Sequence, residues 1–133
     1  MSFGYGCILS ICVKQKVNTR SSTEAELVGL DDVISKILWA KRFMEHQGFV
    51  MENKVYRDNT SSMKLEQNGR ASASKRTRHF NIKYFYVTDL VRRKEVELEY
   101  CPTEEMMADY MTKPLTGVLF EKFRRQIMGF DII

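Results

Sequence analysis

Residues 54–59 of this chain read KVYRDN, a short run that predicts a β-strand followed by an acidic residue, Asp58, and an amide, Asn59. Open α/β folds place their ligands beyond the carboxyl ends of the sheet strands. We therefore expect Asp58 to lie at the functional edge of a sheet. The plainer alternative is that Asp58 caps the next helix, since acidic residues are common in that position.

Two other carboxylates are placed to meet Asp58. Glu26 falls near the start of a predicted helix, and Asp109 falls among methionines in a later one. Each has a plainer alternative role, because Glu26 could simply interact with the helix dipole and Asp109 could occupy an exposed helix position. Three carboxylates in one place would suit a divalent metal ion.

The strand patterns lie in the first and last thirds of the chain as well as at residues 54–57. β-Branched and aromatic residues broken by glycines predict a hairpin made of residues 1–6 and 7–13. Residues 95–101 alternate between apolar and charged side chains, which predicts a strand with one wet side at the edge of a sheet.

Helical spacing of apolar residues predicts most of the remaining elements. The expected helices cover residues 21–47, 63–67, 80–91 and 116–128, with a further one between Pro102 and Pro114. Ser21 and Glu24 have the spacing of a capping box at the start of the first helix.

Residues 69–79 carry four fixed positive charges and no large apolar side chain. Since such a segment cannot bury itself, we expect a mobile loop that runs into a helix. Its functional interpretation is contact with nucleic-acid phosphates, which Lys and Arg bind irrespective of sequence. A solvated charge run is the plainer alternative, and His79 could serve only to order the start of the helix. The candidate nucleic-acid-binding residues are Arg70, Lys75, Arg76, Arg78 and His79.

Length and composition fit one compact domain over residues 1–133. The chain is 44% hydrophobic, and no linker or internal repeat divides it. Its net charge of +4 is mild, but the basic residues cluster, which indicates an anionic partner. The three cysteines fit neither a disulfide framework nor a zinc site, so we expect an intracellular, cytoplasmic protein. The apolar start is too short to cross a bilayer, and we expect no membrane partner.

Four short motifs, in their order and spacing, resemble the ribonuclease H domain of copia-type retrotransposon polyproteins. They are SSTEAEL at residues 21–27, RDN at 57–59, KRTRH at 75–79 and ADYMTKPL at 108–115. The resemblance extends over nearly the whole chain. It implies an α/β fold in which a ribonuclease H-like mixed sheet is flanked by helices.

The resemblance also implies a chemistry. Enzymes of this type place carboxylates around two Mg²⁺ ions, which activate water and stabilise the charge at the phosphate being cleaved. Glu26, Asp58 and Asp109 match three of the family's four positions, so the resemblance makes them catalytic residues and metal ligands, with Mg²⁺ or Mn²⁺ as cofactor. The implied reaction is hydrolysis of the RNA strand of RNA–DNA hybrids during reverse transcription. The implied partner is the reverse transcriptase portion of the same polyprotein, inside virus-like particles.

The family's first position, an aspartate on its first strand, has no match, because no Asp or Glu precedes Glu24. We therefore expect the family's central first strand to be missing from this chain, so that exposed strand edges favour self-association. Two hypotheses follow. One is a metal-dependent endoribonuclease that is impaired by itself, and the other is a catalytically inactive nucleic-acid-binding or assembly module derived from it.

Overall fold

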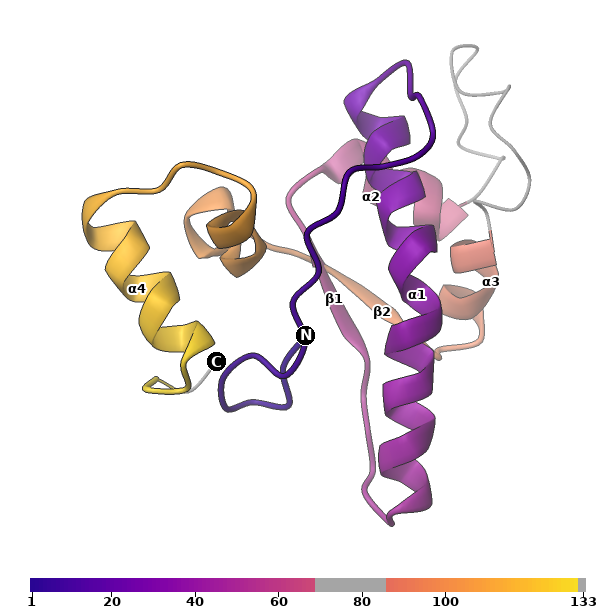
Figure 1. Cartoon of the computed structure of the whole chain (residues 1–133). Coiled ribbons are helices and arrows are strands. Elements are labelled where there is room, and N and C mark those ends of the chain that lie inside the picture. The colour runs from indigo at the N-terminus through magenta and orange to yellow at the C-terminus, as the bar shows by residue number, and fades with distance from the viewer. Residues whose placement is uncertain (69–85, 132–133) are drawn as a thin grey trace. The chain divides into compact units, whose positions relative to one another are not determined.

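The computed structural model describes residues 1–68 and 86–131, and it shows a mixed α/β protein, as predicted (Figure 1). The chain forms two compact units, Gln15–Tyr100 and Met1–Lys14 with Cys101–Ile133. The first unit contains α1 (Ser22–His46), β1 (Lys54–Arg57), α2 (Thr60–Asn68), α3 (Tyr86–Arg92) and β2 (Glu97–Tyr100). The second contains the 3-10 helices η3 (Thr103–Glu105) and η4 (Met107–Met111), and α4 (Gly117–Ile127). No helix in the described ranges is long and apolar enough to cross a membrane.

The start of α1 confirms the predicted cap at Ser21. The backbone of Ser21 is extended, and its hydroxyl accepts a hydrogen bond from the backbone N–H of Glu24 at 3.2 Å. The Glu24 carboxylate accepts in turn from the backbone N–H of Arg20 at 2.8 Å. In a regular capping box the donor to the glutamate is the backbone N–H of the N-cap residue, here Ser21. In this chain the donor is the residue before it.

The end of α1 agrees with the helix predicted over residues 21–47, because its C-cap is Gln47. Gly48 takes a φ of 90°, a left-handed conformation that glycine adopts without strain. Its backbone N–H donates to the carbonyl of Glu45, and that of Phe49 donates to the carbonyl of Met44. These two bonds form a Schellman motif, which satisfies carbonyls that the end of the helix leaves open.

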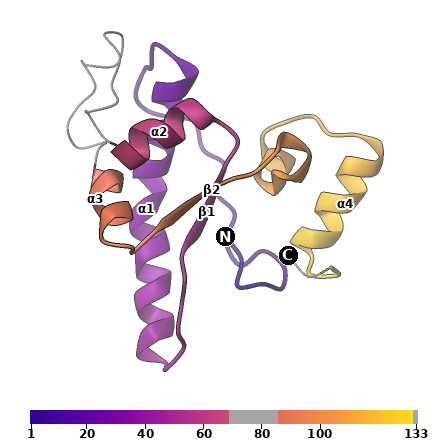
Figure 2. The same cartoon turned by 180° about the vertical axis from the view of Figure 1, so that it is seen from behind.

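The strands β1 and β2 pair in parallel, with Lys54 opposite Glu97 and Arg57 opposite Tyr100. A parallel pair needs a crossover, and α2 and α3 lie on the segment that connects the two strands (Figure 2). Both strands were predicted, and β1 has the predicted bounds. Glu97 and Glu99 of β2 are exposed, as expected for its wet side.

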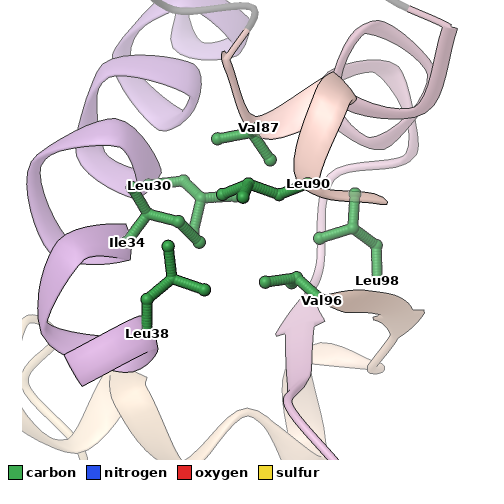
Figure 3. Packing of buried hydrophobic residues seen from close by; sticks show 7 residues of the cluster. All are labelled: Leu30, Ile34, Leu38, Val87, Leu90, Val96 and Leu98. Carbon is green, nitrogen blue, oxygen red and sulfur yellow. The ribbon is translucent and has the colours of Figure 1, made fainter. Parts of the chain in front are cut away.

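The hydrophobic core of the first unit lies where α1, α3 and β2, with the residue that precedes β2, meet. Figure 3 shows its side chains converging from these three elements. They are Leu30, Ile34, Leu38, Val87, Leu90, Val96 and Leu98. Burial of this apolar surface holds α1 against the crossover and so fixes the start of α1 beside the end of β1.

The predicted N-terminal hairpin is wrong, because residues 1–13 contain no β-strand. Gly4 and Gly6 take φ values of 107° and 63°, which interrupt an extended run. A Cβ on Gly6 would lie 3.1 Å from backbone atoms of Gly129 and Ile127. The segment is held instead by a hydrogen bond from the backbone N–H of Cys7 to the carbonyl of Ile127 at 2.8 Å.

Three predicted helices differ from expectation in their bounds or type. The helix expected over residues 63–67 is the longer α2. The one expected between Pro102 and Pro114 forms as η3 and η4, because Met106 between them has a ψ of 86° that no α-helix accommodates. Of the helix expected over residues 80–91, the described part is α3, and residues 80–85 lie outside the described ranges. The closing helix is confirmed as α4, with Phe123 buried.

Candidate functional site

A cluster of polar side chains lies in the first unit, where the early part of α1, the end of β1 and the helix α2 come together. We call it the Glu26 cluster, and it consists of Glu26, Arg57, Asn59, Ser62 and Glu66. These side chains come from three elements that are separated in sequence. Their hydrogen bonds therefore fix the geometry of the predicted ligand Glu26.

Asn59 links the helix α2 to Glu26. Its side-chain oxygen Oδ1 accepts hydrogen bonds from the backbone N–H groups of Ser61 and Ser62, at 3.0 and 3.1 Å. Its Nδ2 donates to Oε1 of Glu26 at 3.0 Å. Asn59 thus caps α2, so the capping role considered for Asp58 is filled by its neighbour.

Glu26 receives hydrogen bonds on both carboxylate oxygens. Besides the bond from Asn59 to Oε1, the Ser62 hydroxyl lies 3.2 Å from Oε2 and Nη2 of Arg57 lies 3.4 Å from it. The acid in the first turn of α1 is Glu24. Glu26 is therefore held by β1 and α2 rather than by the dipole of its own helix, and 30% of its side chain stays exposed to solvent.

Glu66 of α2 is the most buried charged residue of the cluster. Its side chain is 0% exposed, and its Oε1 lies 2.8 Å from Nη2 of Arg57. The other oxygen, Oε2, and the Arg57 Nε have no hydrogen-bond partner among the described residues. Burial raises the pKa of Glu66 from 4.5 to about 7, while the charge of Arg57 opposes this rise and that of Glu26 adds to it.

The raised pKa of Glu66 predicts a pH-dependent stability. Between pH 4.5 and about 7 the folded chain binds more protons at Glu66 than the unfolded chain does, so the free energy of unfolding should fall as the pH rises through this window. The steepest slope should be about 1.4 kcal/mol per pH unit. Urea unfolding at several values of pH between 5 and 8 measures this slope. Glu66→Gln should flatten the profile, whereas Glu45→Gln, at an exposed acid of α1, should not. Equal slopes in all three proteins would contradict the assignment.

Asp58 and Asp109, the other predicted ligands, lie in different units. Asp58 is partly exposed and stands between Arg57 and Asn59, both of which contact Glu26. Asp109, in η4, is only 8% exposed, so its alternative role as an exposed helix position is excluded. Its Oδ2 lies 2.7 Å from Nζ of Lys113, which compensates for its burial. The meeting of the three carboxylates stays a prediction.

The oxygen donors of Glu26 and Asp58 have the chemistry that Mg²⁺ prefers, since hard cations bind carboxylate oxygens. Within the described part of either unit, no three His, Cys, Asp or Glu side chains gather closely enough to hold a metal ion. A cation shared by Glu26 and Asp58 would therefore need a further ligand. The predicted nucleic-acid-binding residues lie outside the described residues, and they are Arg70, Lys75, Arg76, Arg78 and His79.

Sequence reasoning missed three members of the cluster, Arg57, Ser62 and Glu66. Ser62 and Glu66 are spaced by four residues and therefore share one face of α2. A serine and a glutamate on one face normally indicate the solvent side of a helix. The burial of that face arises from the tertiary approach of β1 and α1, for which residues 60–68 carry no local signal.

Comparison with known proteins shows a distant similarity to retrotransposon polyproteins over most of the chain. The chain is 30% identical to the retrovirus-related Pol polyprotein from transposon TNT 1-94 of Nicotiana tabacum over 121 residues. The aligned residues make up 90% of this chain and 9% of that protein. It is 29% identical over 116 residues to the Pol polyprotein from transposon RE2 of Arabidopsis thaliana, covering 86% of this chain and 8% of that protein. The chain thus spans less than a tenth of the length of these curated relatives. No protein-family model and no solved structure matches it.

Proposed function

We propose that this chain is the ribonuclease H-type region of a copia-type retrotransposon Pol polyprotein, and that it hydrolyses the RNA strand of RNA–DNA hybrids. The observation that carries the proposal is the attachment of Glu26 to the carboxyl end of β1. Asn59 bonds the Glu26 carboxylate directly and follows Asp58 in the chain. The similarity to Pol polyproteins over 90% of the chain supports the proposal from a separate direction.

The proposed metal ligands are Glu26, Asp58 and Asp109. Mg²⁺ held by these residues would supply an activated water and stabilise the charge at the phosphate. Asn59 and Ser62 restrict the rotamers of Glu26, since Asn59 donates a hydrogen bond to one oxygen of its carboxylate and Ser62 donates one to the other. Such pre-orientation of a ligand by its neighbours tightens metal binding.

The proposed substrate contacts are made to the sugar–phosphate backbone. Arg70, Lys75, Arg76, Arg78 and His79 would bind phosphates, so that recognition depends on the shape of the hybrid rather than on its base sequence. The proposed macromolecular partner is the reverse transcriptase portion of the same polyprotein.

Hydrolysis of an end-labelled RNA–DNA hybrid tests this function. We expect the purified chain, which has no match for one of the family's four carboxylates, to cut the RNA strand slowly and only when Mg²⁺ or Mn²⁺ is present. Asp58→Asn should slow this weak reaction by a further factor of about 100 through loss of a ligand. The matched control is Asp32→Asn, which changes an exposed acid of α1 and should leave the rate unchanged. Metal-dependent cleavage that survives Asp58→Asn would contradict the assignment of the site.

A second candidate is a catalytically inactive module that binds hybrids. The observation in its favour is that both oxygens of Glu26 already accept hydrogen bonds from the protein. The same assay distinguishes the two functions, because the second one predicts a shifted hybrid in a binding gel and an intact RNA strand in either metal.

A further inference from the structure

One guanidinium nitrogen of Arg57 serves two carboxylates. Nη2 lies 2.8 Å from Oε1 of Glu66 and 3.4 Å from Oε2 of Glu26. The shorter contact marks Glu66 as the main partner of Arg57. Glu26 receives the same positive charge at a longer distance.

The three charged groups differ in their access to solvent. The Glu66 side chain is fully buried, that of Arg57 is 13% exposed and that of Glu26 is 30% exposed. The Arg57–Glu66 pair therefore forms the inner part of the cluster, and Glu26 forms the outer part that an ion from solvent can reach. The inner pair needs an explanation beyond stability, because a buried ion pair is seldom more stabilising than apolar side chains of the same volume.

We propose that Arg57 is a resident counter-charge for Glu26, anchored by Glu66, which keeps the Glu26 carboxylate in place until a divalent cation takes it over. The inference rests on the proposed function, since it concerns the metal site at Glu26. With a cation bound, Glu66 would hold Arg57 in place, so the guanidinium would not follow Glu26 and repel the metal. Glu66 is thereby a positioning residue that acts through Arg57.

This arrangement predicts changes of opposite sign for two kinds of substitution. Removing the charge of Glu66 alone leaves Arg57 to pair with Glu26, which strengthens the competitor of the metal. Removing the charges of both Glu66 and Arg57 leaves Glu26 without a neighbouring guanidinium, which makes its carboxylate a better metal ligand. A purely structural role for the pair would instead predict that both substitutions weaken metal binding.

The test is titration of the full chain with Mn²⁺ by calorimetry at pH 8. We expect Glu66→Gln to weaken Mn²⁺ binding by about fivefold and the double variant Arg57→Met with Glu66→Leu to tighten it by about fivefold. Glu45→Gln, which removes an exposed charge of α1, should match the unsubstituted chain. Circular dichroism checks that each variant is folded. The double variant replaces the buried ion pair with apolar side chains of similar volume. Proteins commonly tolerate this kind of replacement.

The outcomes separate this inference from the proposed function. If the unsubstituted chain binds Mn²⁺ but both variants bind it equally or more weakly, the counter-charge role is overturned and the metal site stands. If the unsubstituted chain binds no Mn²⁺, the proposed metal site fails, and the inference fails with it. If Glu66→Gln does not fold, the double variant decides, because only tighter binding supports the inference.

Discussion

Arg57→Ala should lower the free energy of unfolding by about 3–5 kcal/mol, because it leaves Glu66 as a buried carboxylate without a counter-charge. Glu66 is 0% exposed, and Arg57 is the partner of its Oε1. The loss should be larger at pH 8 than at pH 5, since at the lower pH Glu66 avoids the unpaired charge by taking up a proton. Urea unfolding at both values of pH measures the effect.

The control for this prediction is Arg93→Ala. Arg93 is half exposed and pairs with Asp89 and Glu95 at the surface of the same unit. Exposed ion pairs contribute at most about 1 kcal/mol to stability, so this variant should unfold near the unsubstituted chain. If Arg57→Ala cost no more than Arg93→Ala, the buried pair would not be formed in solution.

Leu90→Ala should lower the free energy of unfolding by about 2–5 kcal/mol, through lost apolar burial and the cavity left behind. Leu90 is 0% exposed and projects from α3 into the core cluster, beside side chains of α1 (Figure 3). Since α1 carries Glu26, loosening this contact should also weaken the order of the Glu26 cluster. Urea denaturation measures the loss of stability.

The matched control for Leu90→Ala is Val50→Ala in the same unit. Val50 is 97% exposed, so its truncation removes no buried surface and should change stability by less than about 0.5 kcal/mol. Similar losses for the two variants would mean that α3 does not pack on α1 as described.

The elements with strong local signals could be predicted from the sequence. Ser21 and Gly48 mark the two ends of α1, and both act there through backbone geometry that their own residue types favour. β1 has the predicted bounds because its alternating side chains fit a strand with one face toward the core. These signals act within a few residues, so they depend little on the tertiary setting.

Features that depend on long-range contacts could not be predicted in the same way. The hairpin expected over residues 1–13 has suitable residue types, but Gly4 and Gly6 adopt positive φ values, and Cys7 bonds to Ile127 at the far end of the chain. The burial of Glu66 likewise depends on the approach of Arg57 from β1. Asp109 shows the opposite case, since its methionine neighbours indicated burial, and Lys113 follows at helical spacing to pair with it.

The position of a divalent cation in crystals of the chain soaked in Mn²⁺ tests the proposed metal site directly. We expect an anomalous scattering peak at bonding distance, about 2.0–2.3 Å, from carboxylate oxygens of Glu26, Asp58 and Asp109 together. Peaks that lie away from Glu26 and Asp58, or an Asp109 that remains paired with Lys113 far from the ion, would contradict it.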